Sequence, residues 1–228
     1  MPSIAAFRQE LQRAVSLRAE YVVLHPGSAK SSLRKTAAKT FVQSLLEAAK
    51  GTRLDGLRVL IENTAGQGNV LGSSLEELAE ILAGLWEEVP AGVCIDTAHL
   101  FAAGYGIHTA HGLNETVRQL DATVGLGNVR LIHANDSKAA FASHCDRHEH
   151  IGEGKIGVAA FRRIVRHPKL RTIPFICETP VDSPNDDRRN VEMMRCLAAG
   201  GKMVGRKQKA AVGQSEQGKR QWARGKRK

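Results

Sequence analysis

Five residues of the types that bind metal ions recur along the sequence, each at the end of a short apolar run. They are His25, Glu62, Asp96, His133 and Glu178. An apolar run of this length is typical of a buried strand in a parallel sheet. The spacings between the five residues, 37, 34, 37 and 45 positions, are each about one strand–helix unit. Because the carboxyl ends of parallel strands lie on one face of an α/β fold, we expect the five side chains to point into one pocket.

Three further residues of these types extend the pattern. His99 follows Asp96 by three positions, and Asp146 and His148 lie in a long polar loop over residues 137–157. Loops of this length in a compact domain usually carry function. Imidazole and carboxylate groups without thiolates are ligands that zinc uses in hydrolytic sites, where open coordination positions remain. The set therefore predicts a metal site of this kind.

Alternating strands and helices are predicted to position these residues. The expected strands cover residues 21–24, 57–61, 92–95, 129–132 and 173–177, and the expected helices cover residues 4–15, 33–50, 75–85, 114–120, 158–167 and 187–199. Ser74 and Glu77 form a capping-box pattern, and Asn114 is the expected N-cap of the fourth helix. The alternation predicts an α/β fold with a parallel sheet and right-handed crossovers, of the (β/α)8 TIM-barrel type.

Five strand–helix units are fewer than the eight of a full barrel. We therefore expect either three further strands upstream of Met1, which would leave this chain incomplete at its N-terminus, or an open half-barrel. The catalytic domain is expected over residues 1–199. Residues 200–228 contain ten Lys or Arg and one Glu, which accounts for most of the net charge of +10. This composition predicts a disordered tail, which either aids solubility or holds nucleic acid through counterion release.

The remaining composition narrows the class of protein. No run approaches 18 apolar residues, so no membrane span is expected. No signal-peptide pattern is visible, and the four cysteines are scattered without a CxxC motif. These features predict a cytoplasmic protein without a disulfide framework, in which Cys94 and Cys177 serve as small core residues.

The sequence around the candidate ligands forms a series of short motifs. They read His-Pro-Gly-Ser at residues 25–28, Ile-Glu-Asn-Thr-Ala-Gly-Gln-Gly at 61–68, Cys-Ile-Asp-Thr-Ala-His at 94–99, Phe-Ala-Ala-Gly-Tyr at 101–105, His-Ala-Asn-Asp-Ser-Lys at 133–138, Asp-Arg-His at 146–148, Gly-Glu-Gly at 152–154 and Glu-Thr-Pro at 178–180. In this order the motifs resemble those of endonuclease IV, a family of zinc-dependent apurinic/apyrimidinic endonucleases with a (β/α)8 barrel. The basic tail lies outside the resemblance.

The resemblance implies a cluster of three Zn²⁺ ions, although ligands of these types also accept Mn²⁺. The implied ligands are His25 and Glu62 for the first ion, Glu62, Asp96, His133 and Glu178 for the second, and His99, Asp146 and His148 for the third. In the family one more His binds the first zinc from an earlier strand end, and no residue of this sequence matches it.

The implied reaction is incision of duplex DNA on the 5′ side of an abasic site, with removal of 3′-blocking groups as a further activity. Glu178 is the candidate for orienting the attacking hydroxide, and Glu62 is the bridging catalytic carboxylate. Arg147, between two implied ligands, is a candidate for holding a DNA phosphate. The implied partner is double-stranded DNA with abasic sites. No protein partner is implied, and a monomer is expected.

Two other functions compete with this interpretation. One is a metal-dependent sugar isomerase or epimerase of the related xylose-isomerase-like group, which also gathers Glu, Asp and His at strand ends. The other is a truncated, inactive DNA-binding remnant, which the missing strands favour.

The sequence also suggests roles for several polar residues near these motifs. Asn63 and Asn135 either orient neighbouring ligands or form plain strand-end turns. Asp136 and Lys138 are interpreted as a surface pair. Five more histidines are expected to be solvated, namely His108, His111, His144, His150 and His167.

Overall fold

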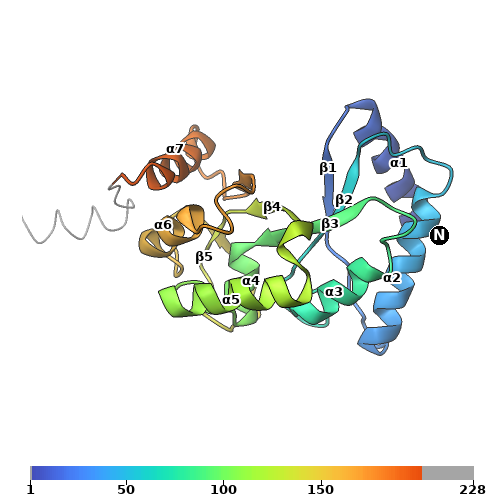
Figure 1. Ribbon diagram of the computed structural model, residues 1–228, viewed down its shortest axis with the longest axis horizontal. Helices are drawn as coiled ribbons and strands as arrows, with labels where there is room; N and C mark the ends of the chain where they lie inside the picture. The colour runs from blue at the N-terminus through green and yellow to red at the C-terminus, as the bar shows by residue number, and fades with distance from the viewer. Residues whose placement is uncertain (1, 202–228) are drawn as a thin grey trace, which may run out of the picture.

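Five parallel strands form one curled sheet at the centre of the structure, in the order in which they occur along the chain (Figure 1). They are β1 (Tyr21–Leu24), β2 (Arg58–Glu62), β3 (Ala91–Asp96), β4 (Val129–His133) and β7 (Phe175–Ile176). This computed structural model describes residues 2–201, so nearly all of the predicted basic tail lies outside the described residues. The prediction of a parallel TIM-barrel-type sheet with five strand–helix units is confirmed.

The helices follow one another around the outer side of the sheet (Figure 1). They are α1 (Pro2–Ser16), α2 (Arg34–Ala49), α3 (Leu75–Ala83), α4 (Thr97–Ala103), α5 (Ala110–Thr123), α6 (Val158–Arg166) and α7 (Asp186–Ala198), with a short 3-10 helix η1 (Leu126–Asn128). α1 packs on α2, α2 on α3, α3 on α5, α5 on α6, and α6 on α7. None of these helices within residues 2–201 combines the length and apolarity needed to cross a bilayer.

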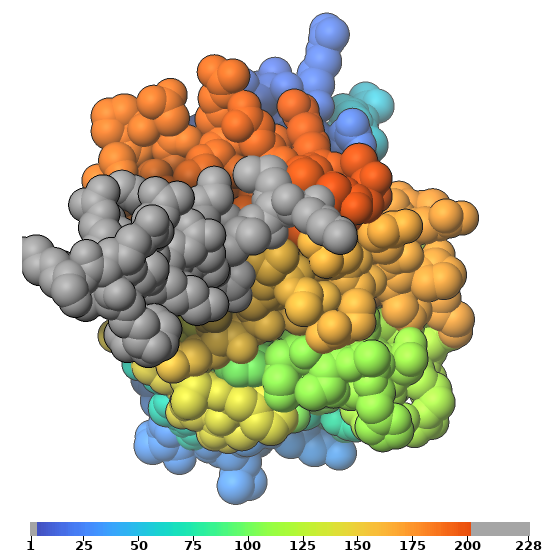
Figure 2. Space-filling view, turned by 90° about the vertical axis from the view of Figure 1, so that its left-hand side faces the viewer, coloured from blue at the N-terminus to red at the C-terminus, as the bar shows by residue number. Residues whose placement is uncertain are grey.

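The space-filling view in Figure 2 faces the end of the molecule formed by the later helices. Orange-red residues of α7 lie above gold residues of α6, and green residues of α5 lie below them, as in Figure 1. Successive helices therefore remain neighbours at this end of the sheet.

Side chains of the strands alternate between two apolar layers. On β2, Val59 and Ile61 are fully buried in the core between sheet and helices, whereas Leu60 belongs to a separate cluster with Cys94 and Leu131. This alternation follows from the two-residue period of a strand. It gives the sheet an inner face, as a barrel has, and confirms Cys94 as a buried core residue.

Two helix starts test the predicted caps. Ser74 Oγ accepts a hydrogen bond from the Glu77 backbone N–H at 3.2 Å, so the predicted cap of α3 is confirmed. The predicted N-cap Asn114 is wrong, because α5 begins at Ala110. Thr109 caps that helix instead, and its Oγ1 accepts from the Gly112 N–H at 3.0 Å. A Thr followed by small residues is a weaker cap signal than Asn, which explains the misplaced start.

Two further elements differ from the prediction. β7 contains two residues instead of the predicted five, since it pairs with β4 through Phe175 and Ile176 alone. The polar loop after β4 contains an antiparallel pair that was not predicted, β5 (Asp136–Ser137) with β6 (His148–Glu149). Both features lie where the chain carries predicted ligands.

Candidate metal centre

Three predicted ligands end neighbouring strands of the sheet. Glu62 is the last residue of β2, Asp96 of β3 and His133 of β4. Asp96 and His133 are in register with each other, so their side chains leave the sheet at the same level. All three are buried. Glu62 Oε1 lies 2.8 Å from His133 Nδ1, which brings the ends of two strands that are not adjacent into contact.

The other predicted ligands converge on this rim from neighbouring segments. His25 follows β1 directly, and its Nε2 lies 3.2 Å from Glu62 Oε2. Glu178 comes two residues after β7, and its Oε2 lies 2.9 Å from His133 Nδ1. His99 lies in α4, with Nδ1 3.7 Å from Glu62 Oε1. The structure therefore gathers these side chains around Glu62 and His133.

Asp146 and His148 complete the group from the polar loop. Asp146 Oδ2 lies 3.2 Å from His99 Nε2, and Asp146 Oδ1 lies 3.4 Å from His148 Nε2. His148 Nε2 is also 3.7 Å from Asp96 Oδ2. All eight residues named from the sequence are thus joined by side-chain approaches of 2.8–3.7 Å at one rim of the sheet.

Two histidine nitrogens indicate that this rim is built for a cation. His99 Nε2 and His148 Nε2 are buried and have no hydrogen-bond partner within residues 2–201. A buried polar atom without a partner costs about 1–3 kcal/mol, so it needs an explanation. Both nitrogens face carboxylate oxygens that do not meet hydrogen-bond geometry, and a metal ion between them would satisfy all of these atoms. The residues present therefore fit a metal with nitrogen and oxygen ligands.

The atoms group slightly differently from the implied ligand sets. Glu62, Asp96, His133 and Glu178 each place one ligand atom within 4.8 Å of the others, as the implied second ion requires. A second such group combines His99 and His148 with Asp96 instead of Asp146, and a third combines His25, Glu62 and His99. A further group pairs Glu62 and His133 with the buried thiol of Cys94.

Two asparagines contact the candidate ligands at the strand ends. Asn63 Oδ1 accepts the Asp96 backbone N–H at 2.7 Å. Asn135 Nδ2 donates to Asp96 Oδ2 at 2.5 Å, and Asn135 Oδ1 accepts the Glu178 N–H at 2.8 Å. Both side chains are buried, and their contacts support orientation of neighbouring side chains over a plain strand-end turn.

The spacing between Asp96 and His99 has a local cause. Asp96 is the N-cap of α4, and its Oδ1 accepts the His99 backbone N–H at 2.8 Å. His99 Nδ1 lies 2.9 Å from the Asn63 carbonyl oxygen, which fixes the ring with Nε2 toward the site. α4 was not among the predicted helices, although an Asp before Thr-Ala-His-Leu is a recognisable N-cap signal.

Asp136 organises the loop that carries Asp146 and His148, and the predicted surface pair with Lys138 is wrong. Asp136 is fully buried and accepts backbone N–H groups of five residues. They are Ser137, Gly152, Gly154, Ile156 and Gly157. Burial raises the pKa of Asp136, and the backbone donors act in the opposite direction. A Cβ on Gly154 would lie 2.4 Å from Asp136 Oδ1, so the Gly-Glu-Gly motif permits this close approach.

One of the histidines expected to be solvated is buried. His150 Nδ1 lies 3.1 Å from Asn190 Nδ2, and the ring is almost completely enclosed. Of the other four, His111 is exposed, whereas His108 is only partly exposed and contacts the ring of Phe101. Sequence periodicity does not report on such loop residues, because their burial depends on which helix packs over them.

The charges at the rim stabilise each other. Burial would raise the pKa of Glu62, but hydrogen bonds with His133 and His25 outweigh it and lower the pKa to about 2. Burial would lower the pKa of His99, but the carboxylates of Asp96 and Asp146 raise it to about 9. Glu62 is therefore an anion at neutral pH. In the metal-free chain His99 carries a proton that a metal ion must displace.

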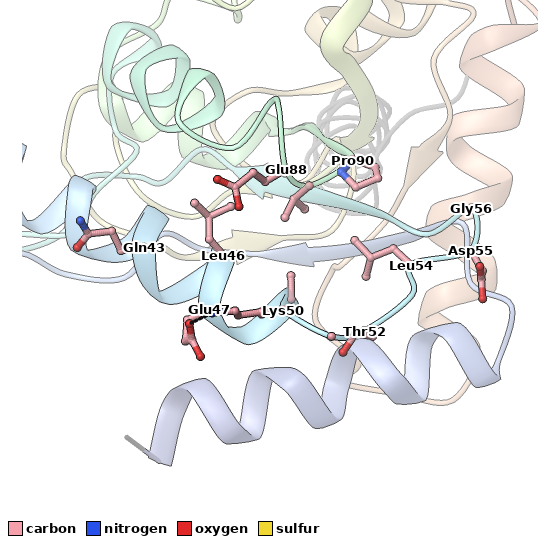
Figure 3. Close-up of a pocket in the computed structure, with 13 residues that line it drawn as sticks. Gln43, Leu46, Glu47, Lys50, Thr52, Leu54, Asp55, Gly56, Glu88 and Pro90 are labelled. Carbon is pink, nitrogen blue, oxygen red and sulfur yellow. Dashed lines mark ion pairs between the residues drawn. The ribbon is translucent and has the colours of Figure 1, made fainter.

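A hollow of about 630 Å³ lies at the other end of the sheet (Figure 3). It is lined by the C-terminal turn of α2 and by the segments that precede β2 and β3, including Leu46, Leu54 and Pro90. Its charged side chains, Glu47, Lys50, Asp55 and Glu88, do not converge on a common point in the view of Figure 3. The candidate ligands gather instead at the carboxyl ends of the strands, the end that carries the active site in other barrels.

Comparisons with known proteins identify the family of this chain. A model of the xylose isomerase-like TIM barrel family matches residues 2–199. The probable endonuclease 4 of Solibacter usitatus is 52% identical over 198 residues, which are 86% of this chain and 68% of that protein. The probable endonuclease 4 of Methanoculleus marisnigri is 38% identical over 196 residues, which are 86% of this chain and 70% of that protein.

Solved structures extend the comparison. The crystal structure of endonuclease IV from Thermus thermophilus has a TM-score of 0.73 at 35% identity, covering 87% of this chain and 69% of that one. A D-tagatose 3-epimerase-like protein has a TM-score of 0.59 at 22% identity, covering 83% of this chain and 66% of that one, and this likeness shows the fold alone. The chain spans about two thirds of the length of these proteins. From the family match, the identities and the gathered ligands together, the chain belongs to the endonuclease IV group of the xylose isomerase-like TIM barrel family.

Proposed function

We propose that this protein is a DNA repair endonuclease that hydrolyses the phosphodiester bond 5′ to abasic sites in duplex DNA. The centre would hold up to three zinc ions, with Mn²⁺ as a substitute, and would also clean blocked 3′ ends. This proposal rests on two buried nitrogens, His99 Nε2 and His148 Nε2, which face carboxylates and have no hydrogen-bond partner among residues 2–201. They occur in a chain whose relatives are named endonuclease 4.

Glu62 is suited to bridge two ions. Its Oε2 faces His25 at 3.2 Å and its Oε1 faces His133 at 2.8 Å, so the two oxygens address two different histidines. With a pKa of about 2 the carboxylate is ionised throughout the physiological range. When bound there, zinc would supply positive charge for the phosphoryl oxygens and would lower the pKa of a water molecule.

Glu178 is suited to orient the attacking water. Its side chain is 48% exposed, which places the carboxylate at the mouth of the centre and within reach of solvent and substrate. The hydrogen bond from its backbone N–H to Asn135 fixes the position of the residue. The carboxylate contacts His133 and can accept a proton from water on its other side.

Arg147 is suited to hold a phosphate beside the centre. It lies between Asp146 and His148 in an exposed position, and its Nη1 donates to the Asp146 carbonyl oxygen at 2.6 Å. Its remaining guanidinium donors are directed to no acceptor within the described residues. An abasic nucleotide must leave the helix to reach the metal centre, and its missing base stacking lowers the cost of doing so.

The proposal is tested by incision of a duplex that contains one stable abasic analogue. The wild-type chain should cut on the 5′ side and leave a 3′-hydroxyl that a polymerase extends, and a strong chelator should stop the reaction. Asp96→Asn, purified in parallel, should be inactive, which excludes a contaminating nuclease. Asp121→Asn is the matched control, because Asp121 is an exposed carboxylate on α5 that pairs with Lys169.

The two competing functions are outcomes of the same experiment. Salt-sensitive DNA binding that is independent of metal, without cleavage, would identify a binding remnant. Isomerisation of a ketose in a substrate panel, without incision, would identify a sugar isomerase or epimerase. The likeness to an epimerase-like protein, at 22% identity, supports this last alternative through fold alone.

A further inference from the structure

Two of the proposed ligands, His148 and Glu178, lie in segments with little regular secondary structure. His148 belongs to β6, which is only two residues long. Glu178 lies two residues beyond β7, which is equally short. A metal ligand must be held close to its productive position, and short strands supply few hydrogen bonds for that purpose.

One buried side chain of α7 connects both segments. Asn190 is 1% exposed, and its Oδ1 accepts the Ile151 backbone N–H at 2.9 Å. Its Nδ2 donates to Thr179 Oγ1 at 2.8 Å and to the Asp186 carbonyl oxygen at 2.9 Å. The same nitrogen lies 3.1 Å from His150 Nδ1. The Asn190 amide therefore joins α7 to the loop segment at residues 150–151 and to the segment at Thr179.

These contacts lie next to the proposed ligands in sequence. Ile151 is three residues after His148, and Thr179 immediately follows Glu178. The two ligand segments also touch directly, since His148 Nδ1 lies 3.0 Å from the Glu178 carbonyl oxygen. That contact directs His148 Nε2 toward the centre. Movement of either segment away from α7 would thus change the position of both ligands together.

We infer that Asn190 is a positioning residue of the metal centre, acting on His148 and Glu178 without touching a metal ion or substrate. The inference rests on the proposed function, because it assumes that these two residues bind metal. It also gives α7 a role beyond covering the sheet, since α7 is the rigid element against which both loop segments are fixed. Residues that orient metal ligands typically change metal affinity about 10- to 100-fold when they are removed.

The sharpest test uses Thr179, which is buried and can be changed with little change in shape. Thr179→Val removes the hydroxyl that accepts from Asn190, whereas Thr179→Ser keeps it. Cobalt(II) titration of the metal-free chain, followed by visible absorption, reports affinity and the number of sites without any enzymatic assay. We expect Thr179→Val and Asn190→Ala each to lower the cobalt affinity of the weakest-binding site about 10-fold. Thr179→Ser should have the same cobalt affinity as the wild type.

A double variant tests whether the two side chains act together. Because they share one hydrogen bond, Asn190→Ala with Thr179→Val should weaken metal binding less than the sum of the single effects. Asn114→Ala is the control, since Asn114 is an exposed helical asparagine on α5. In single-turnover incision, Thr179→Val and Asn190→Ala should show a lower rate constant at saturating DNA, with the apparent DNA affinity nearly unchanged.

The outcomes separate this inference from the proposed function. If the wild-type chain binds cobalt and cuts DNA but Thr179→Val equals it in both, the positioning role is wrong and the function stands. Equal losses in Thr179→Val and Thr179→Ser would also overturn the role, because packing rather than the hydroxyl would be responsible. If the wild-type chain binds no cobalt, both proposals fail. Should Asn190→Ala not fold, the Thr179 pair still decides.

Discussion

Glu62, Asp96 and His133 end central strands, whereas Asp146, His148 and Glu178 stand on loops and on very short strands. The first three are buried, and the hydrogen-bond ladder of the sheet sets their spacing. Asp146 and Glu178 are 41% and 48% exposed. The loop segments are positioned instead by hydrogen bonds from their backbone to buried polar side chains. These side chains are Asn135, Asp136 and Asn190. The comparison indicates that strand topology sets the spacing of the first three side chains, with Asn63 and Asn135 orienting Asp96. Buried polar contacts position the loop residues.

The largest difference is expected between the effects of substituting Asp96 and Asp146 on incision. Asp96 ends a strand, and Asp146 lies in the loop. Asp96→Asn should lower kcat/KM for abasic DNA by more than about 100-fold, the upper range for residues that only orient a ligand. Asp146→Asn should lower kcat/KM only about 10-fold, because a water molecule can replace a metal ligand on an exposed loop. Steady-state incision and bound-metal content measure both. An Asp146→Asn loss as large as that of Asp96→Asn would contradict the distinction between strand-end and loop residues.

Glu178→Gln should separate chemistry from binding among the loop residues. Gln keeps the shape of Glu178 but cannot accept a proton, so incision should be abolished while most DNA binding is retained. Single-turnover cleavage and fluorescence anisotropy on the same duplex measure the two properties. Near-normal turnover would refute the role given to Glu178, and loss of binding would make it a structural residue.

The dependence of stability on pH should report the charges of the centre. In the metal-free chain burial would lower the pKa of His99, but Asp96 and Asp146 raise it from 6.5 to about 9. The stability that this raised pKa contributes is fully present below pH 6.5 and is lost as the pH rises through 9. The Tm of the chelated chain should therefore fall by about 10 °C over this range.

Two controls sharpen this measurement. His99→Gln should make the decline shallower without abolishing it, because burial lowers the pKa of His133 but hydrogen bonds with Cys94, Glu178 and Glu62 raise it above this range. His111→Ala, which changes an exposed histidine, should leave the decline unchanged. Zinc should reverse the trend, because metal ions bind unprotonated imidazole and their affinity rises with pH. A chelated chain whose Tm stays level or rises from pH 6.5 to 9 would show that His99 is not held protonated by these carboxylates.

The smallest effect is expected at Arg147, which lies outside the ligand set. Arg147→Ala should remove one phosphate contact, so the slope of log K against log[salt] should become shallower by about 0.9. Arg171→Ala is the matched control, because Arg171 is an exposed arginine before β7, at the opposite end of the sheet. Equal slopes for Arg147→Ala and the wild type would place the phosphate contact elsewhere.

The strand-end residues of the centre could be predicted from the sequence, and the loop residues only in part. The buried runs before Glu62, Asp96 and His133 identify their strands, and parallel topology then dictates that their side chains meet. Asp146 and His148 were located through family motifs, since no periodicity marks a loop ligand. The buried contacts of Asp136 and Asn190 escaped prediction, because a polar residue buried by tertiary packing has the same local sequence signal as an exposed one.

The most direct test of the account is the first coordination shell of zinc bound to the chain, measured by X-ray absorption at the zinc edge. The strand-end and loop residues supply nitrogen and oxygen atoms alone, so we expect zinc–ligand distances of about 2.0–2.1 Å and no sulfur. Cys94 is the alternative ligand, since it lies with Glu62 and His133 in a buried group. Burial raises the pKa of its thiol to about 11, which disfavours the thiolate. A zinc–sulfur distance near 2.3 Å, or a chain that retains no zinc, would contradict the account.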